Sequence, residues 1–329
     1  MNKLVRAAQT SQSLSLAAME EASRFGLREA DIEHLLLALV ISDQSAGNAL
    51  RSLGLDLERA RRAVEEQHDA QLATLGIDVS LPEAGRIVFH ETDGYTWTPR
   101  ALDLIAKSGG RGKGGDAAAV LRELIAEPSG LITDLLRRLD TTPDVLIERL
   151  DQYDSPTEMT TPAAAKVKGR IAGSTETFVS APLDAVSAFL ADPMRIPERE
   201  PSIGAIERAA QNAALGTAWE GTPPTRYPNG KPVKIKPQFR RRSIERIAAG
   251  HRDEIAWSFG YPDVTRGSSV LTEFTLIETI GGTQVRLSRS WSRRQGWRGL
   301  LAWPLRPIQN FVVWITLFQT GSAISRKFR

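Results

Sequence analysis

The organisation of the first half of the chain is decided by an apolar run, Asp31-Ile32-Glu33-His34-Leu35-Leu36-Leu37-Ala38-Leu39-Val40. A related run appears later, Asp116-Ala117-Ala118-Ala119-Val120-Leu121-Arg122-Glu123-Leu124-Ile125. A shorter leucine-rich stretch follows each run, at residues 49–56 and 135–140, and the two sets align with a shift of one residue. Each set has the spacing of a helical unit whose apolar stripe cannot be buried within that unit alone. The pattern therefore predicts two helical repeats packed face to face.

The helical pattern extends beyond these two runs. A further helix precedes each, at residues 13–21 and 98–107, and Thr142-Pro143 has the composition of a helix start. From Gly173 onward, apolar and polar residues alternate with the period of a β-strand. Residues 151–168 contain prolines and threonines but few large apolar residues, which is typical of a linker. We expect a helical domain at 1–152, a linker at 153–168 and a second domain at 169–329.

Length and composition are those of a globular protein with two domains. The chain has 329 residues, of which 41% are hydrophobic and 25% are charged. Its net charge of +3 is too small to indicate a nucleic-acid partner. The absence of cysteine excludes disulfides and thiolate metal sites. Residues 1–20 lack the apolar core of a secretory signal, and residues 311–318 are too few to span a bilayer. We expect a cytoplasmic protein that uses no metal or cofactor.

Residues 5–150 resemble the Clp N-terminal repeat domain of bacterial Clp-type AAA+ unfoldases. The resemblance is carried by the run from Glu33 to Leu39, by Leu53-Gly54-Leu55-Asp56 and by Trp97-Thr98-Pro99-Arg100-Ala101, in order and at matching spacing. It implies an all-α bundle of two pseudo-repeats that docks substrates, adaptors or peptide-like ligands and has no catalytic role. The partners that it implies are a Clp unfoldase, its substrates or its adaptors.

The resemblance does not extend to the ATPase motor of the unfoldases. The glycine-rich run at 109–115 lacks a first glycine at the spacing of a phosphate-binding loop, and it lacks the hydroxyl that binds magnesium. We interpret this run as an inter-helix loop. Trp97 and Arg100 are the candidate peptide-binding residues of this domain, and the alternative for Trp97 is that it covers the core. His34 is expected to be a packed or hydrogen-bonded helix residue, and His68 to be isolated and exposed.

The second half reads as a strand, a pair of helices, several further strands and a long closing helix. The first helix starts at Pro182, a hairpin turn is expected at Gly281-Gly282-Thr283, and the closing helix covers residues 304–329. This order, with Val179-Ser180-Ala181-Pro182 and Gly216-Thr217-Ala218-Trp219, resembles the START-like or SRPBCC (polyketide cyclase-like) helix-grip family over residues 170–329. The resemblance implies an α+β fold in which a curved antiparallel sheet surrounds the C-terminal helix. It also implies a cavity for a lipid or another apolar small molecule.

Strand parity identifies the side chains expected to line that cavity. The strands contribute aromatic and aliphatic residues together with one arginine, and the closing helix contributes three aromatic residues and an isoleucine. The predicted ligand-binding residues are Trp219, Trp257, Phe259, Phe274, Leu276, Leu287, Arg289, Trp291, Phe311, Trp314, Ile315 and Phe318. Large aromatic side chains pack irregularly and so favour a cavity. The alternative is a filled core without a usable void.

We expect a non-enzymatic protein with two binding modules. The sequence shows no nucleophile triad, metal-ligand cluster or dinucleotide-binding loop. Peptide or adaptor docking by the first domain, combined with apolar-ligand binding by the second, would make a ligand-responsive adaptor or a sequestering protein in bacterial proteostasis. The alternative is a polyketide cyclase- or aromatase-like enzyme recruited through its Clp-like domain. In that case an inward-facing Arg289 would orient a carboxylate or keto group.

Two charged segments indicate further alternatives. Residues 231–242 combine lysines and arginines with one aromatic residue, a composition that would suit a phosphate backbone. Alternating lysines near prolines are also typical of an edge strand protected from aggregation, and on that interpretation we expect no nucleic-acid partner. Residues 291–304 mix arginine with tryptophan, which suits peripheral contact with a membrane. A lipid carrier at a membrane surface is therefore a third hypothesis.

Overall fold

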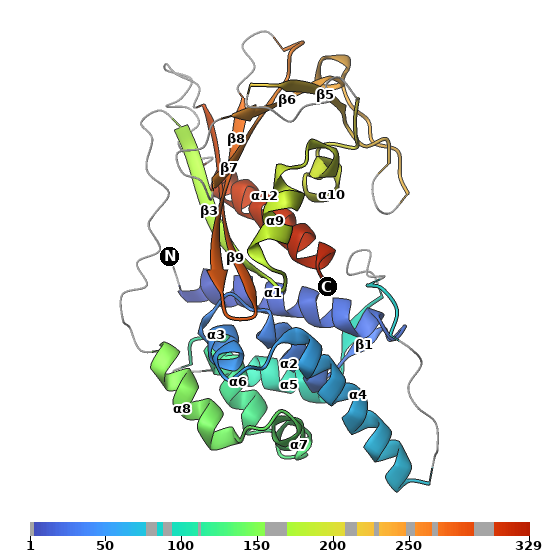
Figure 1. Cartoon of the computed structure of the whole chain (residues 1–329), viewed down its shortest axis with the longest axis vertical. Helices are drawn as coiled ribbons and strands as arrows, with labels where there is room; N and C mark the ends of the chain where they lie inside the picture. The colour runs from blue at the N-terminus through green and yellow to red at the C-terminus, as the bar shows by residue number, and fades with distance from the viewer. Residues whose placement is uncertain are drawn as a thin grey trace. The chain divides into compact units, whose positions relative to one another are not determined.

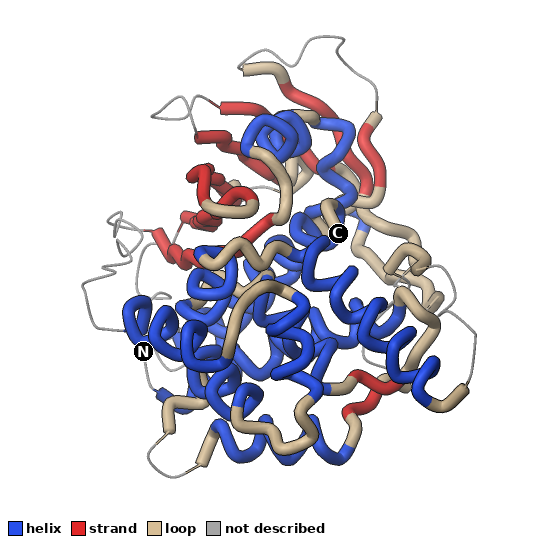
Figure 2. The backbone as a smooth tube through the Cα atoms, turned by 60° about the horizontal axis from the view of Figure 1, so that its bottom comes forward, coloured by secondary structure: helices blue, strands red, loops and turns tan. Residues whose placement is uncertain are grey.

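The computed structural model describes residues 3–76, 84–87, 94–110, 113–154, 170–207, 216–226, 230–247, 254–264, 269–292 and 306–329. The chain divides into two compact units, Met1–Thr157 and Glu158–Arg329. Unit 1 is almost entirely helical, and the strands of the large sheet belong to unit 2 (Figure 2). The helical first half and the antiparallel sheet with a closing helix in the second half are those predicted from the sequence.

The described part of unit 1 contains two sets of four helices. The first set is α1 (Lys3–Ser23), α2 (Ile32–Val40), α3 (Ser45–Ser52) and α4 (Leu57–Thr74). The second set is α5 (Pro99–Ser108), α6 (Ala117–Ile125), α7 (Leu131–Arg138) and α8 (Pro143–Asp154). Two short strands, β1 (Glu29–Ala30) and β2 (Thr96–Trp97), pair in parallel before α2 and α5. Helix α8 continues to Asp154, so residues 153 and 154, which were predicted to be part of the linker, are helical. The rest of the predicted linker lies outside the described residues.

Helix α2 is the centre of unit 1. All nine of its residues are buried, and it contacts α1, α3, α4, α5, α6 and α7. The apolar run at residues 31–40 is therefore packed inside the domain that contains it. Five of the described helices of unit 1 begin at a side-chain cap that satisfies a free backbone N–H, namely α2 at Asp31, α4 at Asp56, α5 at Thr98, α6 at Asp116 and α8 at Thr142. The two repeats thus start their buried helices by the same means.

Arg51, a buried arginine of α3, holds the turn between α2 and α3 through hydrogen bonds. Its Nη1 donates to the backbone carbonyl oxygens of Val40 and Ser42 at 2.6 and 2.8 Å. These are carbonyl groups at the end of α2 that have no partner within the helix. A Cβ atom at Gly47 would lie 2.0 Å from the Ser42 carbonyl oxygen, so the close approach of α3 to this turn requires glycine.

Unit 2 contains one antiparallel sheet in the order β3-β9-β8-β7-β6-β5-β4. Its strands are β3 (Arg170–Val179), β4 (Ala205–Ile206), β5 (Ala218–Thr222), β6 (Arg242–Ile247), β7 (Glu254–Gly260), β8 (Val270–Thr279) and β9 (Gly282–Ser292). Its described helices are α9 (Leu183–Ala191), α10 (Ile196–Arg199), α12 (Arg306–Lys327) and two single 3₁₀ turns, η1 (Pro193–Arg195) and η2 (Pro237–Phe239). Figure 1 shows α9, α10 and α12 together on one side of the sheet, which bends around them.

Two predictions about the strands have different outcomes. The hairpin at Gly281-Gly282-Thr283 is confirmed, since β8 and β9 pair from Thr279 and Gly282 onward and Gly281 has a φ of 77°. The edge strand predicted at 231–242 is wrong. Strand β6 begins only at Arg242 and pairs with both β5 and β7, and the edges of the described sheet are β3 and β4. Within the described part of the chain, no helix has the length and apolar character needed to cross a membrane.

Candidate functional site

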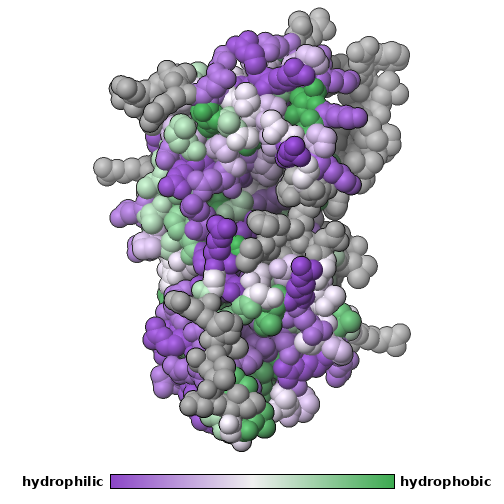
Figure 3. All heavy atoms as spheres, turned by 90° about the vertical axis from the view of Figure 1, so that its right-hand side faces the viewer, coloured by the Kyte–Doolittle hydropathy of each residue, from purple (hydrophilic) through white to green (hydrophobic). Residues whose placement is uncertain are grey.

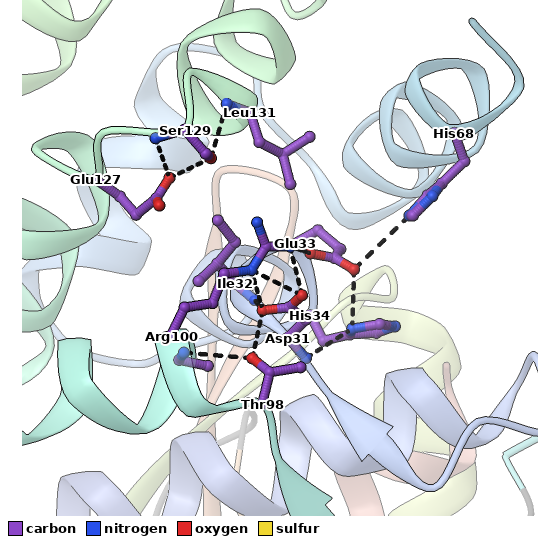
Figure 4. Close-up of polar contacts among 11 residues, drawn as sticks. Asp31, Ile32, Glu33, His34, His68, Thr98, Arg100, Glu127, Ser129 and Leu131 are labelled. Atoms are coloured by element: carbon purple, nitrogen blue, oxygen red, sulfur yellow. Dashed lines mark hydrogen bonds and ion pairs between the residues drawn. The ribbon is translucent and has the colours of Figure 1, made fainter. Parts of the chain in front are cut away.

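A connected polar cluster joins the two repeats of unit 1 (Figure 4). Asp31, the N-cap of α2, accepts hydrogen bonds from the Ile32 backbone N–H at 2.8 Å and from Thr98 Oγ1 at 2.6 Å. Arg100 Nε donates to Asp31 Oδ1 at 2.7 Å, and Arg100 Nη2 bonds the same carboxylate. Burial opposes ionisation of Asp31, but the hydrogen bonds from Arg100 and Thr98 outweigh it and lower its pKa. One carboxylate therefore fixes the first turn of α2 against the first turn of α5.

The neighbouring Glu33 extends this cluster to α4. Glu33 is only 5% exposed, and its Oε1 is 3.7 Å from His68 Nε2, while its Oε2 is 3.7 Å from Arg100 Nη2. The Glu33 carboxylate raises the pKa of His68 more than burial lowers it. The prediction that His68 is isolated is wrong, because α4 packs against α2 and brings His68 to Glu33.

His34 has the packed and hydrogen-bonded role predicted for it. Its Nδ1 accepts the backbone N–H of Asp31 at 3.1 Å, which completes the cap of α2. Because this nitrogen is an acceptor, its contact with Glu33 at 3.6 Å is not an ion pair. Burial lowers the pKa of His34, which keeps the ring neutral.

The two predicted peptide-binding residues differ in whether their side chains are available to contact a peptide. Trp97 lies in β2 and is partly buried, opposite Ala30 of β1. The Arg100 side chain is 41% exposed, but its guanidinium is already held by the carboxylates of Asp31 and Glu33. Arg100 therefore positions the start of α5 and is not a free cation. On the face drawn in Figure 3, hydrophobic residues are interspersed with hydrophilic ones.

In unit 2, most of the predicted ligand-binding residues of the strands lie together in one buried core. The buried members are Trp219, Trp257, Phe259, Phe274, Leu276 and Leu287, and Trp291 packs against them. The rings of Trp219 and Trp257 are 5.7 Å apart, and the Trp257 indole N–H donates to the Leu190 carbonyl oxygen at 3.0 Å. Strand parity thus placed these side chains on the correct face of the sheet.

The predicted face of the closing helix is wrong. The buried apolar residues of α12 are Val313, Leu317 and Ile324. Trp314, Ile315 and Phe318 are only partly buried, and the rings of Trp314 and Phe318 stack on each other at 5.5 Å. The physical reason is the close approach of β3, where a Cβ at Gly173 would lie 2.5 Å from Val313 Cγ1. The side chain of Phe311 lies outside the described residues.

An arginine in the middle of this core was missed by the sequence analysis. Arg199 ends α10 and is 2% exposed, with its guanidinium 5.7–5.8 Å from the rings of Phe189, Trp257 and Phe274. Its Nη2 donates to the Leu190 carbonyl oxygen at 2.9 Å. Burial lowers its pKa to about 10. No local pattern marks this residue, because its partners are distant in sequence.

Two further arginines are buried on the inner side of the sheet. Arg289 faces inward as predicted and is 9% exposed, but its Nη1 is 3.0 Å from Glu200 Oε2, so it is ion-paired within the chain. Arg242 is 7% exposed and lies over the ring of Tyr261 at 4.1 Å. The described residues contain no group of three or more His, Asp or Glu side chains that could hold a metal ion.

Comparison with known proteins bears on unit 1. No curated protein matches the chain. Among solved structures, the chain is similar to protein CV1439 from Chromobacterium violaceum, at 14% sequence identity and a TM-score of 0.31, over 48% of this chain and 99% of that one. A similarity at this level carries no argument about fold or function. Residues 7–83, which include α2 and the other helices of the first repeat, match the family of the Clp repeat (R) N-terminal domain.

Proposed function

We propose that unit 1 docks peptide segments of protein substrates or adaptors, as expected of a Clp N-terminal domain. The observation that carries this proposal is the family match over residues 7–83. The cluster around Asp31 supports it, since a docking surface built from two repeats needs those repeats held rigidly together. Because the sequence has no phosphate-binding loop, the protein would act as an adaptor or as a sequestering protein that competes with a Clp unfoldase.

The surface that we assign to docking surrounds β1 and β2. Trp97 is partly exposed there, and Leu27 and Leu102, near the two strands in sequence, are 47% and 57% exposed. Exposed apolar side chains around a short strand suit an extended peptide, whose side chains would contact them while its backbone runs past. Arg100 would contribute by keeping Trp97 and α5 in place.

Binding of an unfolded protein to the full-length chain tests this proposal. Fluorescein-labelled β-casein is a suitable probe, and its anisotropy reports binding. We expect Trp97→Ala to weaken binding about tenfold, which is typical for an aromatic residue at the centre of an interface. Leu75→Ala is the matched control, since Leu75 is 74% exposed at the end of α4, away in sequence from β1 and β2. Equal affinity of all three proteins, or no binding by the wild type, would refute the assignment.

We further propose that unit 2 has a START-like fold and binds an apolar small molecule between its sheet and α12. The observation that favours this is the burial of four charged side chains, Arg199, Glu200, Arg242 and Arg289, in unit 2. Buried charges destabilise a domain, and chains retain them mainly where they serve a site. Native mass spectrometry of the purified protein, followed by denaturing extraction, tests for a bound molecule of a few hundred daltons.

Together the two proposals describe a ligand-responsive adaptor. Coupling between the units would appear as a change in the affinity for β-casein when unit 2 has bound its small-molecule ligand. An unchanged affinity would leave two independent binding modules.

A further inference from the structure

We propose that the ligand of unit 2 is an amphipathic monocarboxylic acid whose carboxylate binds Arg242. The inference deepens the proposed ligand binding by unit 2 and rests on it. It starts from a buried guanidinium, two of whose nitrogens have no hydrogen-bond acceptor in the described part of the chain. Nε and Nη1 of Arg242 are both buried, and neither has a hydrogen-bond partner among the residues that the structure describes. A buried donor without an acceptor costs free energy, and an anionic ligand would remove that cost.

Arg242 lies on the inner side of the sheet. Along β6, the buried residues are Arg242 and Ile244, and they alternate with the more exposed Ser243 and Glu245. Opposite Arg242 on β5 is Gly221, where a Cβ would lie 2.8 Å from Ile244 Cδ1. The side chain therefore points to the core side of the sheet, where it stacks on Tyr261 and is not drawn out to solvent.

The partners of the other buried charges leave Arg242 as the group that an anion would bind. Three arginines and one carboxylate are buried in the described part of unit 2: Arg199, Arg242, Arg289 and Glu200. Glu200 is paired with Arg289 at 3.0 Å, and Arg199 is bound by backbone carbonyl groups and surrounded by three rings. Among the described residues, Arg242 is the buried arginine of this group with neither an ion pair nor an acceptor for its Nε and Nη1. One carboxylate would balance it, and guanidinium groups bind carboxylates with matched geometry.

The surroundings of Arg242 select an apolar body for this acid. Ile244 is two residues further along the same face of β6. Trp219 of β5 and Phe259 of β7 are in register with Ile244 on either side, and all three are buried. The rest of a molecule whose carboxylate binds Arg242 would therefore lie against a row of aromatic and aliphatic side chains. Fatty acids and aromatic acids have this combination of groups.

Three probes of equal chain length test the inference on the full-length protein by isothermal titration calorimetry, below their micelle concentrations. They are dodecanoate, dodecanol and dodecyl phosphate. We expect dodecanoate to bind about tenfold to a hundredfold more tightly than dodecanol, the range for hydrogen bonds to a charged group. Arg242→Gln should abolish this preference and leave dodecanol binding unchanged. Arg240→Gln is the matched control, because it removes the same charge from an exposed position two residues away.

The outcomes separate this inference from the proposed function. Equal affinities for dodecanoate and dodecanol would overturn the inference and leave apolar-ligand binding in place. No binding of any probe would count against both. A preference for dodecyl phosphate that Arg242→Gln removes would overturn the assignment of a carboxylate.

The thermal midpoint of the ligand-free protein gives a second readout. If Arg242 serves a ligand, Arg242→Gln should leave the midpoint unchanged or raise it, because the variant removes an unpaired buried charge. A midpoint that falls well below that of Arg240→Gln would show that Arg242 has a structural role, and would overturn the inference.

Discussion

Replacing Asp31 should separate the contributions of its two roles, as the cap of α2 and as the acceptor for α5. Asp31→Ala removes both roles. Asp31→Asn keeps a side-chain oxygen that caps a helix as well as aspartate does, but it removes the charge that holds Arg100. The two variants should therefore differ, with alanine the more destabilising.

The magnitude follows from the contacts. Loss of an N-cap costs about 1 kcal/mol. The Thr98 hydroxyl bond to a charged acceptor adds about 1 kcal/mol. The pair with Arg100 adds only about 0.5 kcal/mol, because the Arg100 side chain is 41% exposed and screened by solvent. We expect a loss of about 2.5 kcal/mol for Asp31→Ala and about 0.5–1 kcal/mol for Asp31→Asn, combining these terms.

Helical ellipticity at 222 nm reports the melting of unit 1 in the full-length chain. A loss of about 2.5 kcal/mol corresponds to a fall of roughly 5–10 °C in the melting temperature of a domain of this size. Asp103→Ala is the control, since Asp103 is an exposed residue of α5 whose ion pair with Lys107 lies within one helix. The reasoning is wrong if Asp31→Ala has the same melting temperature as the control, or if the two Asp31 variants have the same melting temperature.

The pH dependence gives an independent check. The folded pKa of Asp31 is below the ordinary value of 3.8, so its charge contributes stability that is fully present above the unfolded pKa. That contribution is lost as the pH falls through the folded pKa. The difference in stability between wild type and Asp31→Asn should be constant near pH 6 and shrink below pH 3.8, as the pH falls through the lowered folded pKa.

Three further outcomes are expected. Gly173→Ala should destabilise unit 2 by about 1–3 kcal/mol in chemical denaturation, because the new Cβ would lie 2.5 Å from Val313 Cγ1. In NMR titrations His68 should show a pKa above its ordinary value that returns toward it in Glu33→Gln, and its stabilising effect should be present at low pH and fade as the pH rises through that raised pKa. Trp257→Phe should cost about 1–3 kcal/mol, since it removes the indole N–H bond to the Leu190 carbonyl oxygen and leaves a smaller ring in a fully buried position.

The sequence by itself determined the parts of this protein that depend on local periodicity. The apolar runs at 31–40 and 116–125 predicted two helical repeats, because a helix with such a stripe must be buried against another. Strand parity placed Trp257, Phe274 and Leu287 on the buried face, because successive side chains of a strand point to opposite sides. The helix start at Thr142-Pro143 and the turn at Gly281 followed from the backbone conformations that those residues favour.

Only the tertiary structure decided which groups meet across the fold. The orientation of α12 depends on how closely β3 approaches it, and the apolar residues on several sides of that helix gave no unique face. Arg100 is bound by Asp31, which lies 69 positions away in the sequence. Arg289 of β9 is bound by Glu200, which directly follows α10. Such pairings between charged groups have no period in the sequence. Arg242, whose Nε and Nη1 have no acceptor among the residues that the structure describes, could be recognised only from the positions of the groups around it.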